Sequence, residues 1–341
     1  MSVSASWPRC PAPCANSVKL DLTVFARRLE YKFAFRLIKT GVNSYELNSI
    51  PSISVANYTF HMAWNASLEL NYTRRDSLGR SKTVAHFNHT GPLRILQSLY
   101  PEGDSICHNV LVHPPGGLVG GDMLDIKIDV ASGAHGLLTT PGATRFYRSD
   151  GEAALQRTSI NLDIDARMEW LPLEAIAYTG CLAENRLTLT LAPGAELLGW
   201  DVTALGLPLA GKAFKSGNFC QHLEMPGIWL ERANIRALDD LLLNSEMGLA
   251  GHRCFATLFF ITGTKLNRQR RQDALDVARS VIEAHHLCAT AGATSPDGQV
   301  VLVRALAPVV EPVMALMRSV WLAWRQQLWQ LDTNSPRIWS T

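Results

Sequence analysis

The sequence predicts a mainly β fold with two helices near the C-terminus. Short runs of alternating apolar and polar residues recur from Trp64 onward, about 10 to 15 residues apart. Glycine and proline separate these runs, and no helical periodicity lies between them. From Trp64 onward, apolar residues at helical spacing occur only after residue 268. A succession of strands followed by helices indicates an all-β core to which the helices are added.

The individual strands follow from this alternation. At residues 122–130 the apolar Leu124, Ile126 and Ile128 alternate with the charged Asp125 and Lys127, as expected for a half-buried strand. Similar patterns predict strands at residues 68–72, 83–89, 93–99, 107–112, 137–140, 155–164, 167–173, 186–191, 196–202, 222–236 and 254–262. The chain shows no internal sequence repeat.

Two amphipathic helices are predicted after the strands, at residues 269–286 and after Pro312, a residue that suits the first turn of a helix. The second helix carries a broad apolar stripe. A stripe of this kind is more often part of the core, but tryptophan and methionine are also enriched at binding hot spots. Beside the core interpretation we therefore consider four partner-binding candidates: Val313, Met317, Trp321 and Trp324.

Residues 1–61 differ in pattern from the rest of the chain. We expect them to form a poorly ordered or mis-annotated N-terminal extension, followed by one β domain with its C-terminal helices over residues 62–341. Within the extension, residues 24–39 have apolar side chains at a spacing of four with basic ones between them, as in an amphipathic surface helix. No compact apolar segment or cleavage site indicates a secretory signal. Met62 is the alternative start of the chain.

The composition is that of a globular chain with a large core, since 47% of its 341 residues are hydrophobic and 18% are charged. A net charge of +2 gives no reason to expect nucleic acid as the main partner. No apolar run reaches the roughly 18 residues of a membrane span. The seven cysteines are odd in number and scattered, which favours reduced thiols over a disulfide framework. We expect a cytoplasmic protein.

The most unusual segment is residues 113–122, HPPGGLVGGD. Its two prolines fix the backbone and remove two hydrogen-bond donors. Its four glycines permit left-handed backbone and close approach of another chain segment. These six residues are Pro114, Pro115, Gly116, Gly117, Gly120 and Gly121. Shaped loops of this kind often carry function. From composition alone, a tight corner between strands is an equally good interpretation of this segment.

No self-sufficient catalytic motif is present in the sequence. Residues 206–213, GLPLAGKA, match the phosphate-binding pattern GxxxxGK, but Ala213 stands where a hydroxyl group should bind Mg²⁺. His86 and His89 fall on opposite faces of a strand and are poor co-ligands for a metal. Glu169 and Glu174 could form an acid/base pair, which keeps a β-rich hydrolase as an alternative function.

Together with its neighbouring blocks, the 113–122 loop resembles the signature of the urease accessory protein UreD family, called UreH in some organisms. The signature comprises His113, the two prolines, the four glycines and Asp122. The similar blocks keep the family's order along the chain. They are GPLR at 91–94, LYPEG at 99–103, LTTPGATRFYRS at 138–149, EWLPLE at 169–174, GWD at 199–201 and PRIW at 336–339. The chain departs from the family pattern at Leu207 and Lys212, where members often carry arginine and glutamate.

The resemblance implies a non-enzymatic chaperone with a wound, solenoid-like arrangement of strands. Proteins of this family bind UreF, which recruits the GTPase UreG, and the complex docks on apo-urease to insert nickel into its active site. The resemblance also implies a nickel passage through the protein, with nickel bound only transiently and no tightly bound cofactor. A purely structural adaptor without nickel contact is a further alternative.

Asp122 and Glu174 lie within the similar blocks and are the expected lining of a nickel path, with His113 as a further candidate. Nickel in transit must exchange, so its ligands should be few and oxygen-rich rather than a thiolate cage. The structural alternative is that the two carboxylates cap backbone amides at turns.

Overall fold

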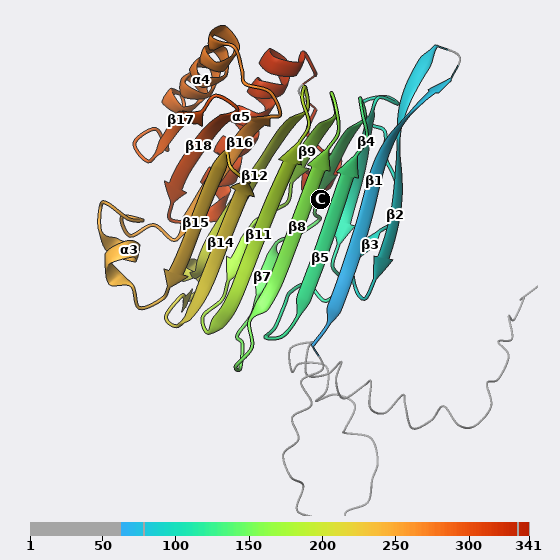
Figure 1. Ribbon diagram of the computed structural model, residues 1–341. Helices are drawn as coiled ribbons and strands as arrows, with labels where there is room; N and C mark the ends of the chain where they lie inside the picture. The colour runs from blue at the N-terminus through green and yellow to red at the C-terminus, as the bar shows by residue number, and fades with distance from the viewer. Residues whose placement is uncertain (1–62, 78, 333, 341) are drawn as a thin grey trace, which may run out of the picture. The chain divides into compact units, whose positions relative to one another are not determined.

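The computed structural model describes residues 63–77, 79–332 and 334–340. Within them the chain forms two β-sheets that face each other, and two helices cover the outer face of the second sheet (Figure 1). The mainly β class with two helices near the C-terminus is thereby confirmed. The predictions for residues 1–61 and for Met62 fall outside the described residues.

The first sheet has seven strands in the order β15-β14-β11-β8-β5-β1-β2. Its central pairings, from β1 to β14, are parallel, and an antiparallel strand closes each edge. The strands are β1 (Asn65–Ser77), β2 (Arg80–Thr90), β5 (Met123–Val130), β8 (Ala154–Leu162), β11 (Cys181–Leu191), β14 (Gly217–Met225) and β15 (Trp229–Arg236). Residues 222–236, predicted as one strand, form parts of β14 and β15 because Pro226 and Gly227 turn the chain.

The second sheet has eleven strands, with the main order β17-β18-β16-β12-β9-β6-β4-β3. These strands are β3 (Arg94–Ile95), β4 (Ile106–Val112), β6 (His135–Thr139), β9 (Arg167–Leu171), β12 (Glu196–Leu207), β16 (Cys254–Thr262), β17 (Ala291–Asp297) and β18 (Val300–Ala307). Three short strands attach to its side: β7 (Thr144–Phe146), β10 (Ala175–Ala177) and β13 (Lys212–Ala213). Strands β17 and β18 were not predicted, because Pro296 interrupts the alternation in β17 and the apolar run of β18 does not alternate.

The chain passes back and forth between the two sheets. It runs from β4 in the second sheet to β5 in the first, then to β6, β8, β9, β11, β12 and β14 in alternation. Strands from successive turns pair in parallel, so each turn stacks on the one before it. The solenoid-like winding that the resemblance implied is confirmed.

Three α-helices lie among the described residues: α3 (Asp240–Asn244), α4 (Arg268–Glu283) and α5 (Val310–Trp329). Single 3₁₀ turns lie at Pro208–Ala210 and Arg337–Ser340. One apolar core fills the space between the sheets, and a second joins the outer face of the second sheet to α4 and α5. The predicted helices correspond to α4 and α5, whereas α3 was not predicted.

Strand β12 contributes to both cores and is buried along almost its whole length. Leu197 lies in the core between the sheets, while Leu198 and Trp200 lie in the core beneath the helices. Burial on both faces explains the nearly continuous apolar run of this strand. Asp201 is the charged residue that interrupts the run.

The apolar stripe of α5, considered above as a partner-binding face, lies in the second core. The side chains of Val313, Met317, Trp321 and Trp324 are 0% exposed and pack against the second sheet and α4. The indole N–H of Trp321 donates to Oε2 of Glu169 at 2.7 Å. This burial contradicts the partner-binding prediction for these four residues and agrees with the core interpretation, because a side chain without exposed surface cannot contact a partner.

Candidate functional site

The glycine-rich loop at residues 113–122 is a close crossing between chain segments. Leu118 is fully buried at its centre; its N–H donates to the Arg145 carbonyl at 2.7 Å, and the Tyr147 N–H donates to the Leu118 carbonyl at 2.8 Å. A Cβ atom at Gly117 would lie 2.3 Å from Cε2 of Tyr147. The loop therefore needs glycine at this position, because the Tyr147 ring occupies the space of a side chain.

The prolines of the loop lie in a turn at its beginning. Pro114 and Pro115 are exposed, and the Gly116 N–H closes the turn by donating to the His113 carbonyl at 2.8 Å. Gly116 has a φ of 72°, the left-handed backbone that the glycines were expected to permit. Proline has no backbone N–H, so neither Pro114 nor Pro115 has a hydrogen-bond donor that would need a partner in this exposed turn.

The second pair of glycines fits the loop against the segment that leads into β8. A Cβ atom at Gly120 would lie 2.6 Å from the carbonyl oxygen of Glu152, and Gly121 has a φ of 84°. The Gly121 N–H donates to the Ala153 carbonyl at 3.2 Å. Gly120 thus permits close approach and Gly121 a left-handed backbone. With these contacts, the prolines and glycines shape the loop into a tight corner.

We expect Gly117→Ala to lower the free energy of unfolding by about 1–3 kcal/mol, since the added methyl group forces the Tyr147 ring or the Arg145 backbone to shift. The measurement is urea unfolding followed by fluorescence. Gly142→Ala is the matched control, because no atom lies within 4 Å of its added Cβ. If the two variants lost equal stability, steric exclusion at Gly117 would not be the reason for its glycine.

Asp122 closes the same loop by accepting two backbone hydrogen bonds. Its Oδ1 accepts from the Trp64 N–H and its Oδ2 from the Val119 N–H, each at 2.9 Å, and the residue is buried. These bonds tie the segment that leads into β1 to the loop. The geometry is that of the structural alternative, in which the carboxylate caps backbone amides.

Two of the three residues predicted for a nickel path line different pockets, and the third lines neither of them. His113 lines a pocket of about 290 Å³ at the end of β4, Glu174 lines another of about 470 Å³, and Asp122 lines neither. Across the described part of the chain, no group of three or more His, Cys, Asp or Glu side chains is arranged to hold a metal ion.

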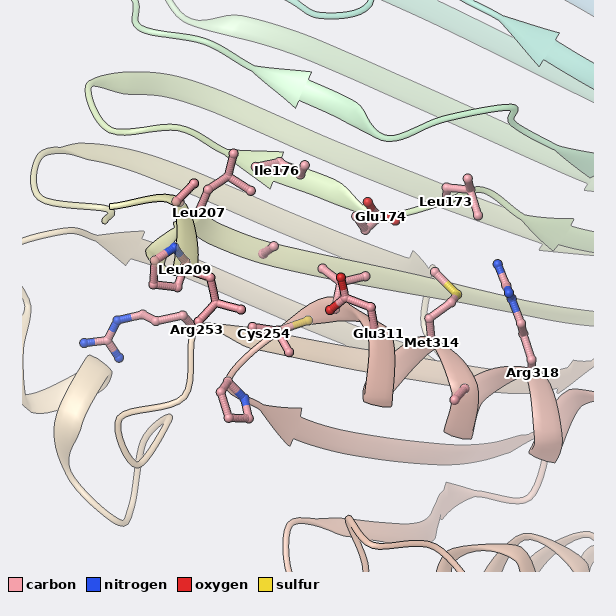
Figure 2. Close-up of a pocket in the computed structure, with 18 residues that line it drawn as sticks. Leu173, Glu174, Ile176, Leu207, Leu209, Arg253, Cys254, Glu311, Met314 and Arg318 are labelled. Atoms are coloured by element: carbon pink, nitrogen blue, oxygen red, sulfur yellow. The ribbon is translucent and has the colours of Figure 1, made fainter. Parts of the chain in front are cut away.

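The pocket that contains Glu174 holds a second carboxylate. Figure 2 shows Glu174, which precedes β10, and Glu311, in the first turn of α5, on facing sides of this pocket, with Cys254 and Met314 beside them. Burial, together with the charges of Glu174 and Glu311, raises the pKa of the Cys254 thiol to about 12. The thiol is therefore protonated at neutral pH, so the two carboxylates, which share the pocket with Arg253 and Arg318, are its groups that could meet a cation.

A row of polar side chains crosses the core between the two sheets. Gln156 on β8, Asn185 on β11 and Gln221 on β14 are directly paired neighbours across the first sheet. Gln156 donates to Asn185 Oδ1 at 3.2 Å, and Gln156 also lines the pocket that contains His113. Asp201 of the second sheet meets this row from the opposite side.

The Asp201 carboxylate accepts hydrogen bonds from Asn185 (2.9 Å), Gln221 (2.6 Å) and Thr203 (3.1 Å). Burial raises its pKa to about 6; the three hydrogen bonds oppose this shift and the charge of Glu231 adds to it. At neutral pH Asp201 thus carries most of a negative charge inside the protein, and all three hydrogen-bond donors are neutral. Such a group favours the approach of a cation.

Glu231 continues the polar row toward the far edge of the second sheet. It accepts a hydrogen bond from Thr257 at 2.7 Å, and its other oxygen pairs with Arg304 at 2.6 Å. The row that we call the interior polar row therefore consists of Gln156, Asn185, Asp201, Gln221, Thr203, Glu231 and Thr257, and the half-exposed Arg304 lies at its outer end. Two of its members are carboxylates, in keeping with an oxygen-rich set of groups.

A separate charged network lies beneath α5. Arg325 is fully buried; it bonds Glu102 at 2.7 Å and its Nε lies 3.3 Å from Oε2 of Glu169, an ion pair without hydrogen-bond geometry. Glu102 also pairs with His108, and Glu169 with His135. Glu169 is 0% exposed and does not line the pocket of Glu174, so the structure does not bring these two carboxylates together as an acid/base pair.

Comparison with known proteins identifies the chain's relatives. The sequence profile of a family described as UreD urease accessory protein matches residues 65–340. The chain belongs to the UreD family. It is 71% identical over 279 residues to the urease accessory protein UreD of Polaromonas sp. (strain JS666), covering 82% of this chain and all of that protein. The corresponding protein of Paracidovorax citrulli is 64% identical, and that of Leptothrix cholodnii 51%, with the same coverage.

In this UreD family chain, Asp201 and Glu231 were not predicted from the sequence as candidate site residues. A usable signal existed for Asp201, because a charged residue within a nearly continuous apolar run predicts a buried carboxylate. Glu231 gave no such signal, since β15 alternates polar and apolar residues as an ordinary edge strand does. Among the described residues no helix is long and apolar enough to cross a membrane.

Proposed function

We propose that the chain is a non-catalytic, cytoplasmic scaffold in urease maturation, which joins UreF and, through UreF, the GTPase UreG, and helps to deliver nickel to apo-urease. Membership of the UreD family supports the link to urease. Nickel is the cargo of this process and is bound only in transit.

The observation that carries the nickel-delivery part of the proposal is the interior polar row centred on Asp201. A buried carboxylate with a pKa of about 6 and neutral hydrogen-bond donors attracts a divalent cation at neutral pH without holding it in a closed ligand set. Gln156 connects this row to the pocket of His113. The route that we propose runs along this row. It also includes Glu174 and Glu311, the two carboxylates of a separate pocket.

Two other functions are less well supported. The β-rich hydrolase would need Glu169 or Glu174 as an acid, but Glu169 is buried and hydrogen-bonded to His135 and Trp321. A purely structural adaptor would give the same complex without a role for Asp201 in nickel transfer. Variants of the acidic residues separate this adaptor from the proposed function.

The test is activation of apo-urease with nickel, GTP, UreF and UreG, in which urease activity and urease-bound nickel are both measured. The wild-type chain should support activation, and its omission should abolish it. We expect Glu174→Ala to keep UreF binding and to lower nickel incorporation several-fold, because its pocket loses one of two carboxylates. Full activation by Glu174→Ala would remove Glu174 from the route, and activation without the chain would refute the proposed function.

A further inference from the structure

The segment at residues 237–251, which contains α3 and which we call the α3 loop, presents large apolar side chains to solvent. Leu238, Leu241 and Met247 are 87%, 77% and 97% exposed. They are three of the eight large apolar side chains that are exposed among the described residues. The loop connects β15 to β16 and projects to the side of the sheets next to β15 (Figure 1).

The exposed side chains stand on a well-fixed backbone. Asp239 caps α3 by accepting from the Leu242 N–H at 3.0 Å, and Leu243 anchors the loop in the core between the sheets. The Arg253 guanidinium donates to the Leu243 carbonyl at 3.1 Å and to Asn244 Oδ1 at 2.8 Å. The apolar groups are thus presented in a preformed arrangement, which lowers the entropic cost of binding a partner.

The charge of the α3 loop restricts the kind of partner. Asp239, Asp240 and Glu246 are acidic, and residues 237–251 contain no lysine or arginine. The flanking Arg253 uses its guanidinium for hydrogen bonds within the loop. Asp240 and Glu246 are exposed beside the apolar side chains. A complementary surface would therefore combine an apolar recess with surrounding basic side chains.

We propose that the α3 loop is a docking surface for a protein partner that presents an apolar recess bordered by lysine or arginine. Leu241 and Met247 enter the recess, and Asp240 and Glu246 face the basic border. Arg253 holds the loop and also lines the pocket of Glu174 and Glu311, so the bound partner lies next to that pocket. This inference rests on the proposed role of the chain in a urease maturation complex.

The test measures binding of the full chain to UreF and, separately, to apo-urease carrying UreF and UreG, each by biolayer interferometry. The Leu241→Ser, Met247→Ser double variant should bind at least one of them about tenfold more weakly than wild type. Leu96→Ser is the matched control, because Leu96 is 78% exposed beside β3 and should leave both affinities unchanged. The melting temperatures should agree, since the substituted side chains are exposed.

A second variant tests the charge argument. Asp240→Lys with Glu246→Lys should weaken the same interaction and reduce its dependence on salt concentration. Affinities within twofold of wild type for both variants and both partners would overturn the docking surface. Loss of wild-type self-association in the serine variant, with partner binding intact, would also overturn it and identify a second copy as the occupant. If the wild-type chain bound neither partner, the proposed function itself would fail.

Discussion

Replacing Arg325 by methionine is expected to lower the free energy of unfolding by about 3–5 kcal/mol, although the new side chain is apolar and of similar length. Arg325 is 0% exposed and contacts two buried carboxylates, Glu102 and Glu169. Without the guanidinium, both carboxylates remain in the interior with their charges less compensated. The loss of stability comes from these remaining groups more than from the missing arginine.

The effect of Arg325→Met should depend on pH. Burial raises the pKa of Glu102, but the hydrogen bonds from His108 and Arg325 outweigh it and hold the pKa below its usual value. A lowered carboxyl pKa stabilises the folded state above the unfolded pKa, and this contribution is lost as pH falls through the folded pKa. The variant lacks part of that contribution, so the difference from wild type should be larger at pH 7, above the usual carboxyl pKa of 4.5, than at pH 3.

Chemical unfolding at the two pH values measures this prediction. Arg279→Met is the control, because Arg279 is half exposed and pairs with Asp276 only at 3.9 Å; it should change stability by less than about 0.5 kcal/mol. Adding Glu169→Gln to Arg325→Met should restore part of the loss by removing one buried charge. Equal stabilities of the wild-type chain and these variants would show that the network beneath α5 contributes nothing to the fold.

The local features of the fold could be predicted from the sequence because they depend on periodicity. Alternation at residues 122–130 gave β5, and the spacing of apolar residues after Pro312 gave α5. The same pattern could not decide what the α5 stripe contacts. Trp321 looks the same in sequence whether it meets a partner or, as here, the Glu169 carboxylate 152 positions earlier.

The candidate site was harder to predict because it depends on contacts between distant positions. The loop at residues 113–122 identified the resemblance, yet its Asp122 bonds backbone amides and its Gly117 makes room for Tyr147. Asp201 becomes conspicuous only when the winding of the chain sets it against Asn185 and Gln221 of the other sheet. Sequence similarity thus identified the family, while the three-dimensional arrangement was needed to find the buried carboxylate.

Asp201→Asn is expected to make the protein more stable at neutral pH and less able to deliver nickel. Burial raises the pKa of Asp201 from 3.8 to about 6, so ionisation of this group destabilises the folded state at higher pH. The shift corresponds to about 3 kcal/mol at most, and the asparagine amide loses one of the accepted hydrogen bonds, so we expect a gain of about 1–2 kcal/mol in the variant at pH 8. Nickel incorporation into urease should fall about tenfold, because the attraction for the cation is lost.

The pH dependence separates this prediction from a simple packing effect. A carboxyl group with a raised folded pKa destabilises the protein fully above that pKa, and the penalty disappears as pH falls below the unfolded value. The stability gain of Asp201→Asn should therefore grow between pH 4 and pH 7 and then level off, as measured by urea unfolding. A constant difference would mean that the pKa of Asp201 is the same in the folded and unfolded states. If the variant is more stable but fully active in nickel delivery, Asp201 does not belong to the route. If it is more stable and delivers less nickel, the carboxylate is retained for function at a cost in stability, as we propose.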